Sequence, residues 1–354
     1  MSSTKTEKTD PGNYFEDFTL GQVFAHATPR TVTDGDIALY TSLYGGRFAV
    51  QSSSEFAKEL GYAAQPVDDL LTFHIAFGKT VPEVSLNAVA NLGYAEGVFG
   101  APVYAGDTIR TTSEVIGLKE NSNGKTGVVY VRSTGTKQTG EMVVDYNRWV
   151  MVNKRDASNP APEPSVPDLK TAVDAADLVL PQGTDFTGYD KGLAGSGDLW
   201  GDYDIGEKID HVDGTTVEEA EHMMATRLYQ NTAKVHFNQF AQSSGRFGKR
   251  LVYGGHVISF ARALSFNGLA NAFRIAAINA GSHTNPIFAG DTVFAWSEVL
   301  DKAACSGRSD LGALRLRTVA TKDHPPADFP YKGDDGKYLP HVVLDLDYWV
   351  LMPR

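Results

Sequence analysis

The sequence predicts an α+β fold that occurs twice, each copy being an antiparallel sheet wrapped around a long central helix. Three observations predict it. The chain has 354 residues, which is enough for two domains. Its two halves share motifs at a nearly constant offset. Each half places apolar residues first at helical spacing and then in strand-like runs, a pattern typical of helices followed by a sheet.

Repeated motifs mark the two copies. VYAGDTI at 103–109 recurs as IFAGDTV at 287–293, an offset of 184. Near the end of each copy, NRWVMV at 147–152 matches DYWVLM at 347–352, an offset of 200. The larger offset indicates an insertion in the second copy, which we assign to a loop around HPPADFPYKGDDGKYLP. Since order and spacing hold along each half, we interpret the chain as two diverged copies of one domain.

Three segments follow from the repeat. We assign 12–155 to an N-terminal domain, 156–199 to a connector and 200–354 to a C-terminal domain. The connector begins DASNPAPEPSVP, and such a proline-rich stretch does not hold a helix or a central strand, so we expect it to be extended. We expect the copies to pack sheet to sheet as an internal pseudo-dimer, with the two sheets joined so that an exposed edge of each is covered.

Apolar spacing locates the helices and strands. In both copies a short helix is followed by a longer apolar helix. The short helices are expected around 37–44 and 223–229, and the longer ones at 69–78 and 255–267. In the first copy the strand-like runs are 87–96, 108–119, 126–137 and 141–153. Asn-Ser-Asn-Gly at 121–124 joins the middle pair of runs and favours a hairpin.

Composition and charge exclude several classes of protein. The formal net charge of −11 argues against nucleic-acid binding, which needs a basic surface. No run approaches the roughly 18 consecutive apolar residues of a membrane span, and the first residues lack the apolar core of a signal peptide. Cys305 is the single cysteine, and no His, Cys and carboxylate residues cluster at metal-ligand spacing. We therefore expect a cytoplasmic protein with no metal or other cofactor and no membrane partner.

The comparison of the two copies points to an active site in the second half. Asn231 and His236 of the second copy align with Gly46 and Gln51 of the first. Imidazole is suited to acid/base work near neutral pH. A polar pair opposite two inert residues therefore predicts one active site per chain, with His236 and Asn231 as its catalytic residues. The alternative, that His236 is a hydrogen-bonded structural histidine, stays open.

A glycine pair marks the start of the second long helix. In YGGH at 253–256, Gly254 and Gly255 allow a ligand close to the backbone, beside His256 and the free N–H groups of a helix N-terminus. Such N–H groups polarise a thioester carbonyl, whose oxygen gains charge in the transition state. The equivalent DDLL at 68–71 lacks the glycines and would repel an oxyanion. A glycine turn packed tightly against the sheet is the alternative interpretation.

The AGDT motif occurs in both copies, which favours a structural role. Asp107 and Asp291 are predicted to fix a loop before a strand, since aspartate side chains accept hydrogen bonds from nearby backbone N–H groups. A catalytic carboxylate pair is the less favoured interpretation of the same residues.

The segment 228–236, the glycine turn and NPIFAGDTV together resemble the MaoC-like, or hydratase 2, family of hot-dog folds. That family's signature is an Asp, an Asn-Pro pair two positions on and a His five positions on. Asn231, Ala233, Lys234 and His236 occupy these positions, so only the His is retained. These departures resemble the mesaconyl-CoA hydratase (β-methylmalyl-CoA dehydratase) subgroup, to which GNYFEDFTLGQVF, NTAKVHFN and LVYGGHVIS are also similar.

The resemblance spans nearly the whole chain and implies a double hot-dog protein. It implies a hydro-lyase that reversibly hydrates mesaconyl-C1-CoA (2-methylfumaryl-CoA) to β-methylmalyl-CoA, in acetyl-CoA assimilation or 3-hydroxypropionate carbon fixation. It implies that the N–H of Gly255 binds the thioester oxygen and that His236 is the acid/base group. Asn231 then orients water, because an amide is not a base. A carboxylic acid elsewhere, such as Glu218 or Asp291, would supply a second proton path.

An anionic acyl group on CoA requires basic contacts. Lys234, Arg246 and Arg250 flank the proposed site and Arg47 is expected on the opposing helix, so these four are predicted to bind the substrate carboxylate or CoA. The alternative for each is a solvated surface charge. We expect an acyl-CoA as the ligand and a homo-oligomer as the assembly.

Two further enzyme functions and one binding function fit the same fold. One is an (R)-specific 2-enoyl-CoA hydratase acting on another acyl chain. Another is an acyl-CoA thioesterase, which usually needs a carboxylate to activate water, and none occurs within 228–241. A third is an acyl-CoA-binding protein without catalysis. Release of free CoA thiol distinguishes the thioesterase from the hydratases.

Overall fold

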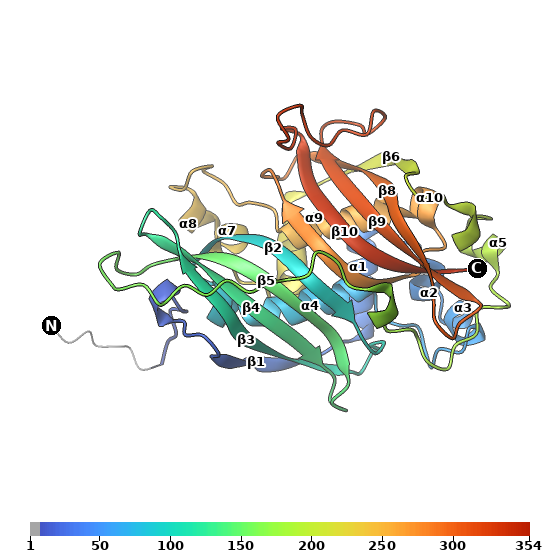
Figure 1. Ribbon diagram of the computed structural model, residues 1–354, viewed down its shortest axis with the longest axis horizontal. Coiled ribbons are helices and arrows are strands. Elements are labelled where there is room, and N and C mark those ends of the chain that lie inside the picture. The colour runs from blue at the N-terminus through green and yellow to red at the C-terminus, as the bar shows by residue number, and fades with distance from the viewer. Residues whose placement is uncertain (1–7) are drawn as a thin grey trace.

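The computed structural model describes residues 8–354, in which one continuous sheet carries helices along one side (Figure 1). The strands of the first half are β1 (Val23–Thr31), β2 (Ala88–Phe99), β3 (Thr108–Glu120), β4 (Thr126–Thr136) and β5 (Met142–Asn153). Those of the second half are β6 (Lys208–Thr216), β7 (Arg274–His283), β8 (Thr292–Ala304), β9 (Leu311–Lys322) and β10 (Val342–Pro353). Their order is β1-β3-β4-β5-β2-β7-β10-β9-β8-β6, antiparallel throughout.

The helices follow the same repeat. The first half has α1 (Asp34–Tyr44), α2 (Ala49–Ser52), α3 (Ser54–Glu59) and α4 (Asp69–Thr80). The second half has α6 (Glu219–Leu228), α7 (Lys234–Phe237), α8 (Gln239–Gln242), α9 (Gly254–Leu264) and α10 (Phe266–Leu269). No helix in the described range 8–354 is long and apolar enough to cross a membrane.

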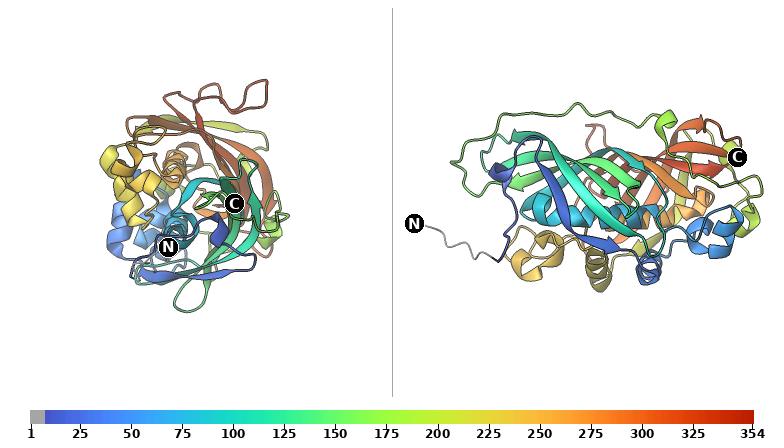
Figure 2. Two further views of the ribbon diagram at one scale, coloured as in Figure 1. Left: turned by 90° about the vertical axis from the view of Figure 1, so that its left-hand side faces the viewer. Right: turned by 90° about the horizontal axis from the view of Figure 1, so that it is seen from below.

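Strands β2 and β7 join the two halves. Tyr94 pairs with Gly281 and Val98 with Ala277, which confirms the expected joining of two sheets into one. Stacking of one sheet face on the other, in contrast, is wrong: the sheets meet edge to edge and curve around the helices, as Figure 2 shows. The physical reason is that α4 and α9 already bury the apolar inner faces of both sheets in one shared core.

The predicted strands β2–β5 are confirmed to within a few residues, and the hairpin at 121–124 is confirmed by the β3–β4 pairing. The sequence reading missed the edge strands β1 and β6. Both are mostly exposed, and the register of each is interrupted, between His26 and Arg30 in β1 and between Asp210 and Gly214 in β6. A half-solvated, bulged edge strand has no regular apolar alternation, so periodicity does not reveal it.

The central helices differ in length from the prediction. α4 is buried at every position from Leu70 to Thr80, including the polar residues Thr72, His74 and Lys79. α9 ends at Leu264, three residues before the expected end. Asn267 is non-helical and Gly268 has a φ of 100°, so the chain turns there and α10 is a separate short segment. The helices touch where the imidazole Nε2 of His74 on α4 lies 3.0 Å from the Ser259 hydroxyl on α9.

The first part of the connector lies on the outer face of the sheet, opposite the helices (Figure 2), and its later part packs against α2 and α3, where the rings of Phe56 and Tyr189 are 5.3 Å apart. The connector is largely irregular, as expected, but contains short helical turns at η3 (Ala175–Asp177) and α5 (Lys191–Ala194). The Trp349 indole donates to the carbonyl of Val173 at 3.0 Å. Val173, Leu178 and Phe186 are buried there, so the connector covers apolar surface that the strands would otherwise expose.

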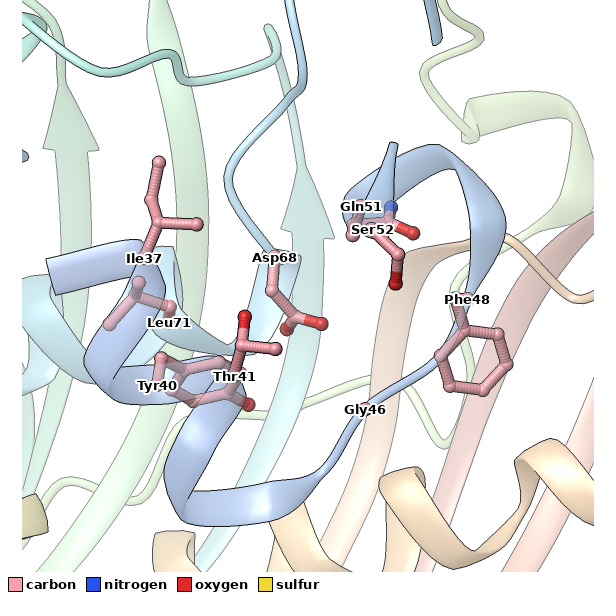
Figure 3. Close-up of a pocket in the computed structure, with 9 residues that line it drawn as sticks. All are labelled: Ile37, Tyr40, Thr41, Gly46, Phe48, Gln51, Ser52, Asp68 and Leu71. Atoms are coloured by element: carbon pink, nitrogen blue, oxygen red, sulfur yellow. The ribbon is translucent and has the colours of Figure 1, made fainter. Parts of the chain in front are cut away.

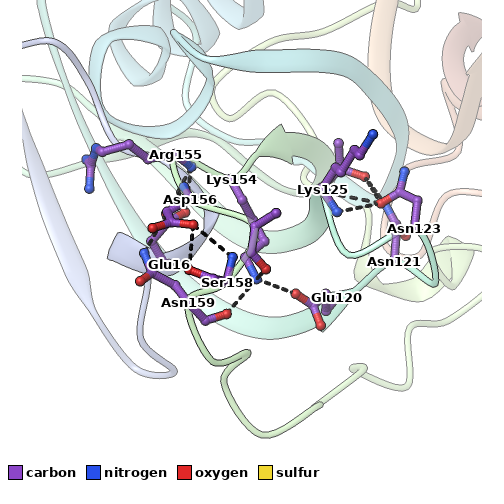
Figure 4. Close-up of polar contacts among 12 residues, drawn as sticks. Glu16, Glu120, Asn121, Asn123, Lys125, Lys154, Arg155, Asp156, Ser158 and Asn159 are labelled. Atoms are coloured by element: carbon purple, nitrogen blue, oxygen red, sulfur yellow. Dashed lines mark hydrogen bonds and ion pairs between the residues drawn. The ribbon is translucent and has the colours of Figure 1, made fainter.

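Polar contacts fix the first residues of the connector (Figure 4). The Glu16 carboxylate accepts hydrogen bonds from the backbone N–H groups of Arg155 and Asp156 at 2.9 and 3.0 Å. The Lys154 ammonium donates to Glu120 at 2.6 Å and to the carbonyl of Asn159 at 2.7 Å. These bonds tie the start of the connector to the N-terminal segment and to the end of β3.

The insertion in the second copy is a packed loop. Trp296 donates its indole N–H to the carbonyl of Pro330 at 3.0 Å. The hydroxyls of Tyr331 and Tyr338 both donate to Asp345, at 2.7 and 2.8 Å. The predicted loop is therefore confirmed, and it covers the outer face of the second half.

Candidate active site

The segment after α6 turns sharply and presents Asn231. Gln230 has a φ of 54°, and the backbone N–H of Asn231 donates to the carbonyl of Thr226 at 2.9 Å. The Asn231 side chain is 1% exposed, and its Oδ1 accepts the Ala233 N–H at 3.2 Å, just before α7 begins. Its Nδ2 group makes no hydrogen bond to another group in the part of the chain that the structure describes, residues 8–354. Asn231 is thus held by one end and offers an N–H donor at the other.

His236 lies on α7, one helical turn further on. Its Nδ1 lies 3.0 Å from the carbonyl oxygen of Leu251. A carbonyl only accepts, so Nδ1 carries the proton and Nε2 has a free lone pair. Within residues 8–354, Nε2 makes no hydrogen bond, and the residue is half-buried. This tautomer is the one that a general base needs.

Burial keeps the imidazole of His236 neutral. Burial lowers the pKa of His236 to about 4, against the raising effect of the Leu251 carbonyl and with a further lowering by the nearby His222. At neutral pH the ring is therefore a base without a charge. A hydrogen-bonded structural histidine would make the same contact with Leu251, so the catalytic role of His236 stays a prediction.

The N-terminus of α9 faces the same region. The backbone N–H groups of Gly254 and Gly255 make no hydrogen bond within residues 8–354. A Cβ on Gly255 would lie 2.3 Å from the ring of Tyr253 and 2.5 Å from the ring of His74, so these two rings require glycine. The two free N–H groups at a helix start are an arrangement that binds a thioester oxygen.

His256 is engaged in a polar contact between the halves. It is fully buried, and its Nδ1 lies 2.6 Å from the hydroxyl of Tyr44 on α1. The Tyr44 hydroxyl lies 2.7 Å from that of Tyr229. Its Nε2 is buried without a partner. A direct role of His256 at the thioester stays a prediction.

His283, at the end of β7, is a residue of this region that the sequence analysis did not single out. A Cβ on Gly254 would lie 2.3 to 2.5 Å from three atoms of the His283 ring, so the ring packs directly on the glycine. A signal existed in the repeat, because the offset of 184 aligns His283 with Phe99. The two copies thus differ at the position of His283 and Phe99, just as they differ at the position of His236 and Gln51.

The predicted basic residues lie in different settings. Arg250 is buried, forms an ion pair with Glu219 and lies 3.5 Å from the carbonyl of His236. Lys234 is exposed on α7, and Arg246 is exposed over the ring of Phe247. Arg47 lies in the loop between α1 and α2, not on a helix as expected, and its guanidinium stacks on Phe266 at 4.6 Å. The structure thus keeps Lys234, Arg246 and Arg250 on one segment around His236.

The first copy has a small pocket at the equivalent position (Figure 3). Gly46, Gln51 and Asp68 line it, and Figure 3 shows Asp68 pointing into it. The Leu70 N–H, which corresponds to that of Gly255, donates to the Asp68 carboxylate at 2.8 Å. The Gln51 side chain donates to the carbonyl of Phe273 at 2.7 Å. The helix start that would hold a thioester oxygen is therefore already occupied by a carboxylate.

The AGDT aspartates are structural, as predicted. Asp107 accepts the N–H of Tyr104 and Asp291 that of Phe288, both at 2.9 Å. The intervening Gly106 and Gly290 each have a φ of 96°. Asp291 is further paired with Lys322 at 3.6 Å. Because the Asp291 carboxylate already accepts the Phe288 N–H and pairs with Lys322, it is poorly suited to supply a second proton path.

Buried histidines predict acid sensitivity of the fold. Burial lowers the pKa values of five of them to about 3 or 4: His74, His211, His236, His256 and His283. The unfolded chain binds these protons below about pH 6.5, so the free energy of unfolding falls as the pH falls from 6.5 towards 4. Burial raises the pKa values of Asp68 and Asp69, to about 7 for Asp69, so these two carboxyl groups act in the opposite direction, against five histidines.

Thermal unfolding followed by circular dichroism at pH 7.5 and pH 5 tests this expectation. We expect a lower Tm at pH 5, because each such histidine contributes up to about 1.4 kcal/mol per pH unit. An equal or higher Tm at pH 5 would contradict the burial of neutral imidazoles.

Comparison with known proteins places the chain among characterised relatives. The family model described as mesaconyl-CoA hydratase matches residues 2–332. A β-methylmalyl-CoA dehydratase of Chloroflexus aurantiacus is 65% identical over 347 residues, covering 98% of this chain and 99% of that protein. A mesaconyl-CoA hydratase of Cereibacter sphaeroides is 62% identical over 347 residues, covering 98% of this chain and all of that protein (100%).

Solved structures agree with the fold. A crystal structure described as a putative MaoC domain protein dehydratase from Chloroflexus aurantiacus has a TM-score of 0.96 at 65% identity, covering 98% of this chain and 99% of that one. A Mycobacterium tuberculosis protein described as having a double hotdog fold has a TM-score of 0.73 at 26% identity, covering 97% and 99%. The predicted double hot-dog fold is thereby confirmed, and the chain belongs to the mesaconyl-CoA hydratase family.

Proposed function

We propose that the protein is a hydro-lyase that reversibly adds water to mesaconyl-C1-CoA to give β-methylmalyl-CoA. The observation that carries this proposal is the packing of the His236 ring on Tyr253, with 5.5 Å between the ring centres, directly before the start of α9. The proposed mechanism uses His236, the amide of Asn231 and the N–H of Gly255. Relatives at 62% and 65% identity that carry these two activity names support the choice of substrate.

The chemistry follows from these three groups. The Asn231 amide holds a water molecule, and Nε2 of His236 takes one of its protons as the oxygen bonds to the β carbon. The electron pair of the C=C bond moves towards the thioester, whose oxygen is stabilised by the N–H of Gly255. The α carbon then gains a proton, for which the imidazolium of His236 is the donor. Glu218 is exposed and Asp291 is held in its turn, so neither carboxyl group is required.

A substrate panel tests the proposal. Loss of enoyl-thioester absorbance is followed with mesaconyl-CoA, crotonyl-CoA and longer 2-enoyl-CoAs. We expect the highest kcat/KM with mesaconyl-CoA and no release of free thiol. A preference for an uncharged enoyl chain would support the (R)-specific 2-enoyl-CoA hydratase instead, and thiol release would support a thioesterase.

We assign Lys234 and Arg246 to the CoA phosphates. Both side chains are exposed on the segment that carries His236, and neither makes an ion pair in residues 8–354. Replacing both by alanine is expected to raise the KM for every acyl-CoA by roughly tenfold at low salt, with little change in kcat. The effect shrinks as ionic strength rises, because exposed charges are screened. KM values at two salt concentrations measure it. An unchanged KM at low salt would show that these are solvated charges without a role in binding.

We also propose a cytoplasmic location, a homo-oligomeric assembly and a role in carbon assimilation. The CoA substrate class of the family supports the first and third, since CoA thioesters are metabolites of the cell interior. The predicted absence of a cofactor rests on the proposed chemistry, which moves protons and water but no electrons.

A further inference from the structure

His283 is held in place by neighbouring residues at the proposed active site, and the proposed mechanism assigns it no role. Its ring lies on Gly254, directly beside the N–H groups assigned to the thioester oxygen. Its Nε2 lies 3.4 Å from the hydroxyl of Tyr94, which reaches across from β2 of the first half. Nδ1 makes no hydrogen bond among the described residues 8–354, and the residue is half-buried. The two halves therefore cooperate to hold one imidazole in a fixed orientation, with one ring nitrogen unused.

The repeat shows that the fold itself does not require a polar residue here. The equivalent residue of the first half is Phe99, which is 1% exposed and is packed in the core. Phe99 pairs with Val144 across its sheet as His283 pairs with Leu344 across the other. The same backbone position thus accepts an aromatic hydrocarbon in the half without an active site. We therefore infer that the imidazole of His283 in the second half serves a function and is not required for packing.

The acyl group of the proposed substrate supplies such a reason, so this inference rests on the proposed function. Mesaconyl-C1-CoA bears a free carboxylate on the carbon that receives the hydroxyl group. With the thioester oxygen on Gly255 and the β carbon beside His236, this carboxylate is held within the site. A desolvated carboxylate needs hydrogen-bond donors.

The cations of the site are poorly placed to be that donor. Arg250 is already paired with Glu219 on the outer side of α6. Arg148 is fully buried and pairs with Tyr94 across β2 and β5, but its guanidinium stacks on the Phe77 ring at 4.3 Å and donates to Thr80. Lys234 is exposed to solvent. His283 and Tyr94, in contrast, lie against the glycine turn itself.

We propose that His283, oriented by Tyr94, binds the free carboxylate of the acyl group and so selects dicarboxylic over monocarboxylic acyl-CoAs. In this arrangement the Tyr94 O–H donates to Nε2, which places the ring proton on Nδ1. That Nδ1–H then donates to the carboxylate. His283 forms no bond to a reacting carbon in this role; it is a specificity residue.

Binding of two matched, unreactive ligands tests the proposal without depending on turnover. Succinyl-CoA and butyryl-CoA have the same chain length and differ in the terminal carboxylate. Titration calorimetry on the wild type is expected to show tighter binding of succinyl-CoA. In His283→Phe, which copies Phe99, succinyl-CoA should bind roughly 10–100-fold more weakly while butyryl-CoA is unchanged, since a hydrogen bond to a charged group is worth about 1.5–3 kcal/mol.

Each outcome has a clear meaning. Retention of the succinyl-CoA preference in His283→Phe would overturn the assignment. So would an equal loss for both ligands, which indicates a general disturbance of the site. Tyr94→Phe is the second variant, and a partial loss of the same preference is expected. Failure of the wild type to hydrate mesaconyl-CoA would instead refute the proposed function, whatever the binding results.

Discussion

His236→Ala is expected to lower kcat by about 10²–10⁴-fold, the range for removal of a general acid/base group, while the fold stays intact. His236 is part of the short helix α7, and within residues 8–354 its ring makes one hydrogen bond, to Leu251, and packs on the ring of Tyr253. The loss in rate follows because the variant lacks the imidazole that takes a proton from water and returns it to the α carbon.

Gln51→Ala is the matched control, because Gln51 occupies the equivalent position of the first copy. It is expected to change kcat by less than about twofold, a change within the range of sites without a catalytic role. Circular dichroism of both variants checks the fold. Turnover close to wild type in His236→Ala, or a comparable loss in Gln51→Ala, would mean that the catalytic residue or the active half has been misassigned.

Gly78→Ala is expected to destabilise the protein by roughly 3 kcal/mol or more, at the upper end of overpacking effects. Gly78 lies within α4, where alanine would by itself favour the helix by about 1 kcal/mol. A Cβ at this position, however, would lie 1.8 Å from the carbonyl oxygen of Tyr229 in the second half. The backbones of the two halves touch here, so they must separate to admit a methyl group.

The contact also involves the active site, because the same Cβ would lie 3.4 Å from the backbone nitrogen of Asn231. We therefore expect a loss of activity together with a lower Tm. Gly35→Ala is the control, since its Cβ on α1 would meet only the Thr33 hydroxyl at 3.5 Å. Thermal unfolding of both variants measures the effect, and we expect a lower Tm for Gly78→Ala than for Gly35→Ala. Equal Tm values would contradict the close approach of the two backbones at Gly78.

The spacing of apolar residues along the chain was sufficient to predict the strands and helices that pack regularly in the core. The strands β2–β5 and the helix α4 alternate or repeat apolar residues over ten or more positions, and their bounds agree closely with the prediction. β1 and β6 failed because they are exposed at the edges of the sheet and bulged. α9 was overextended because Gly268 turns the chain within a sequence that stays apolar.

The active site was only partly accessible to sequence reasoning. His236 and the glycine pair could be found because each contrasts with an inert or acidic counterpart in the first copy. His283 shows the same contrast with Phe99, but its meaning depends on Tyr94, which comes from the other half and is 189 residues away. Contacts between the halves, such as that of Gly78 with Tyr229, leave no local pattern in the chain.

The most direct test of the account is the fate of water oxygen in the product. Mesaconyl-CoA is incubated with the wild type in H₂¹⁸O, and the product is analysed by mass spectrometry with a parallel assay for free thiol. The account predicts an intact CoA thioester that has gained one labelled water, with the label in the β-hydroxyl group and no thiol released. Label in a freed carboxylate, accompanied by stoichiometric CoA thiol, would contradict it.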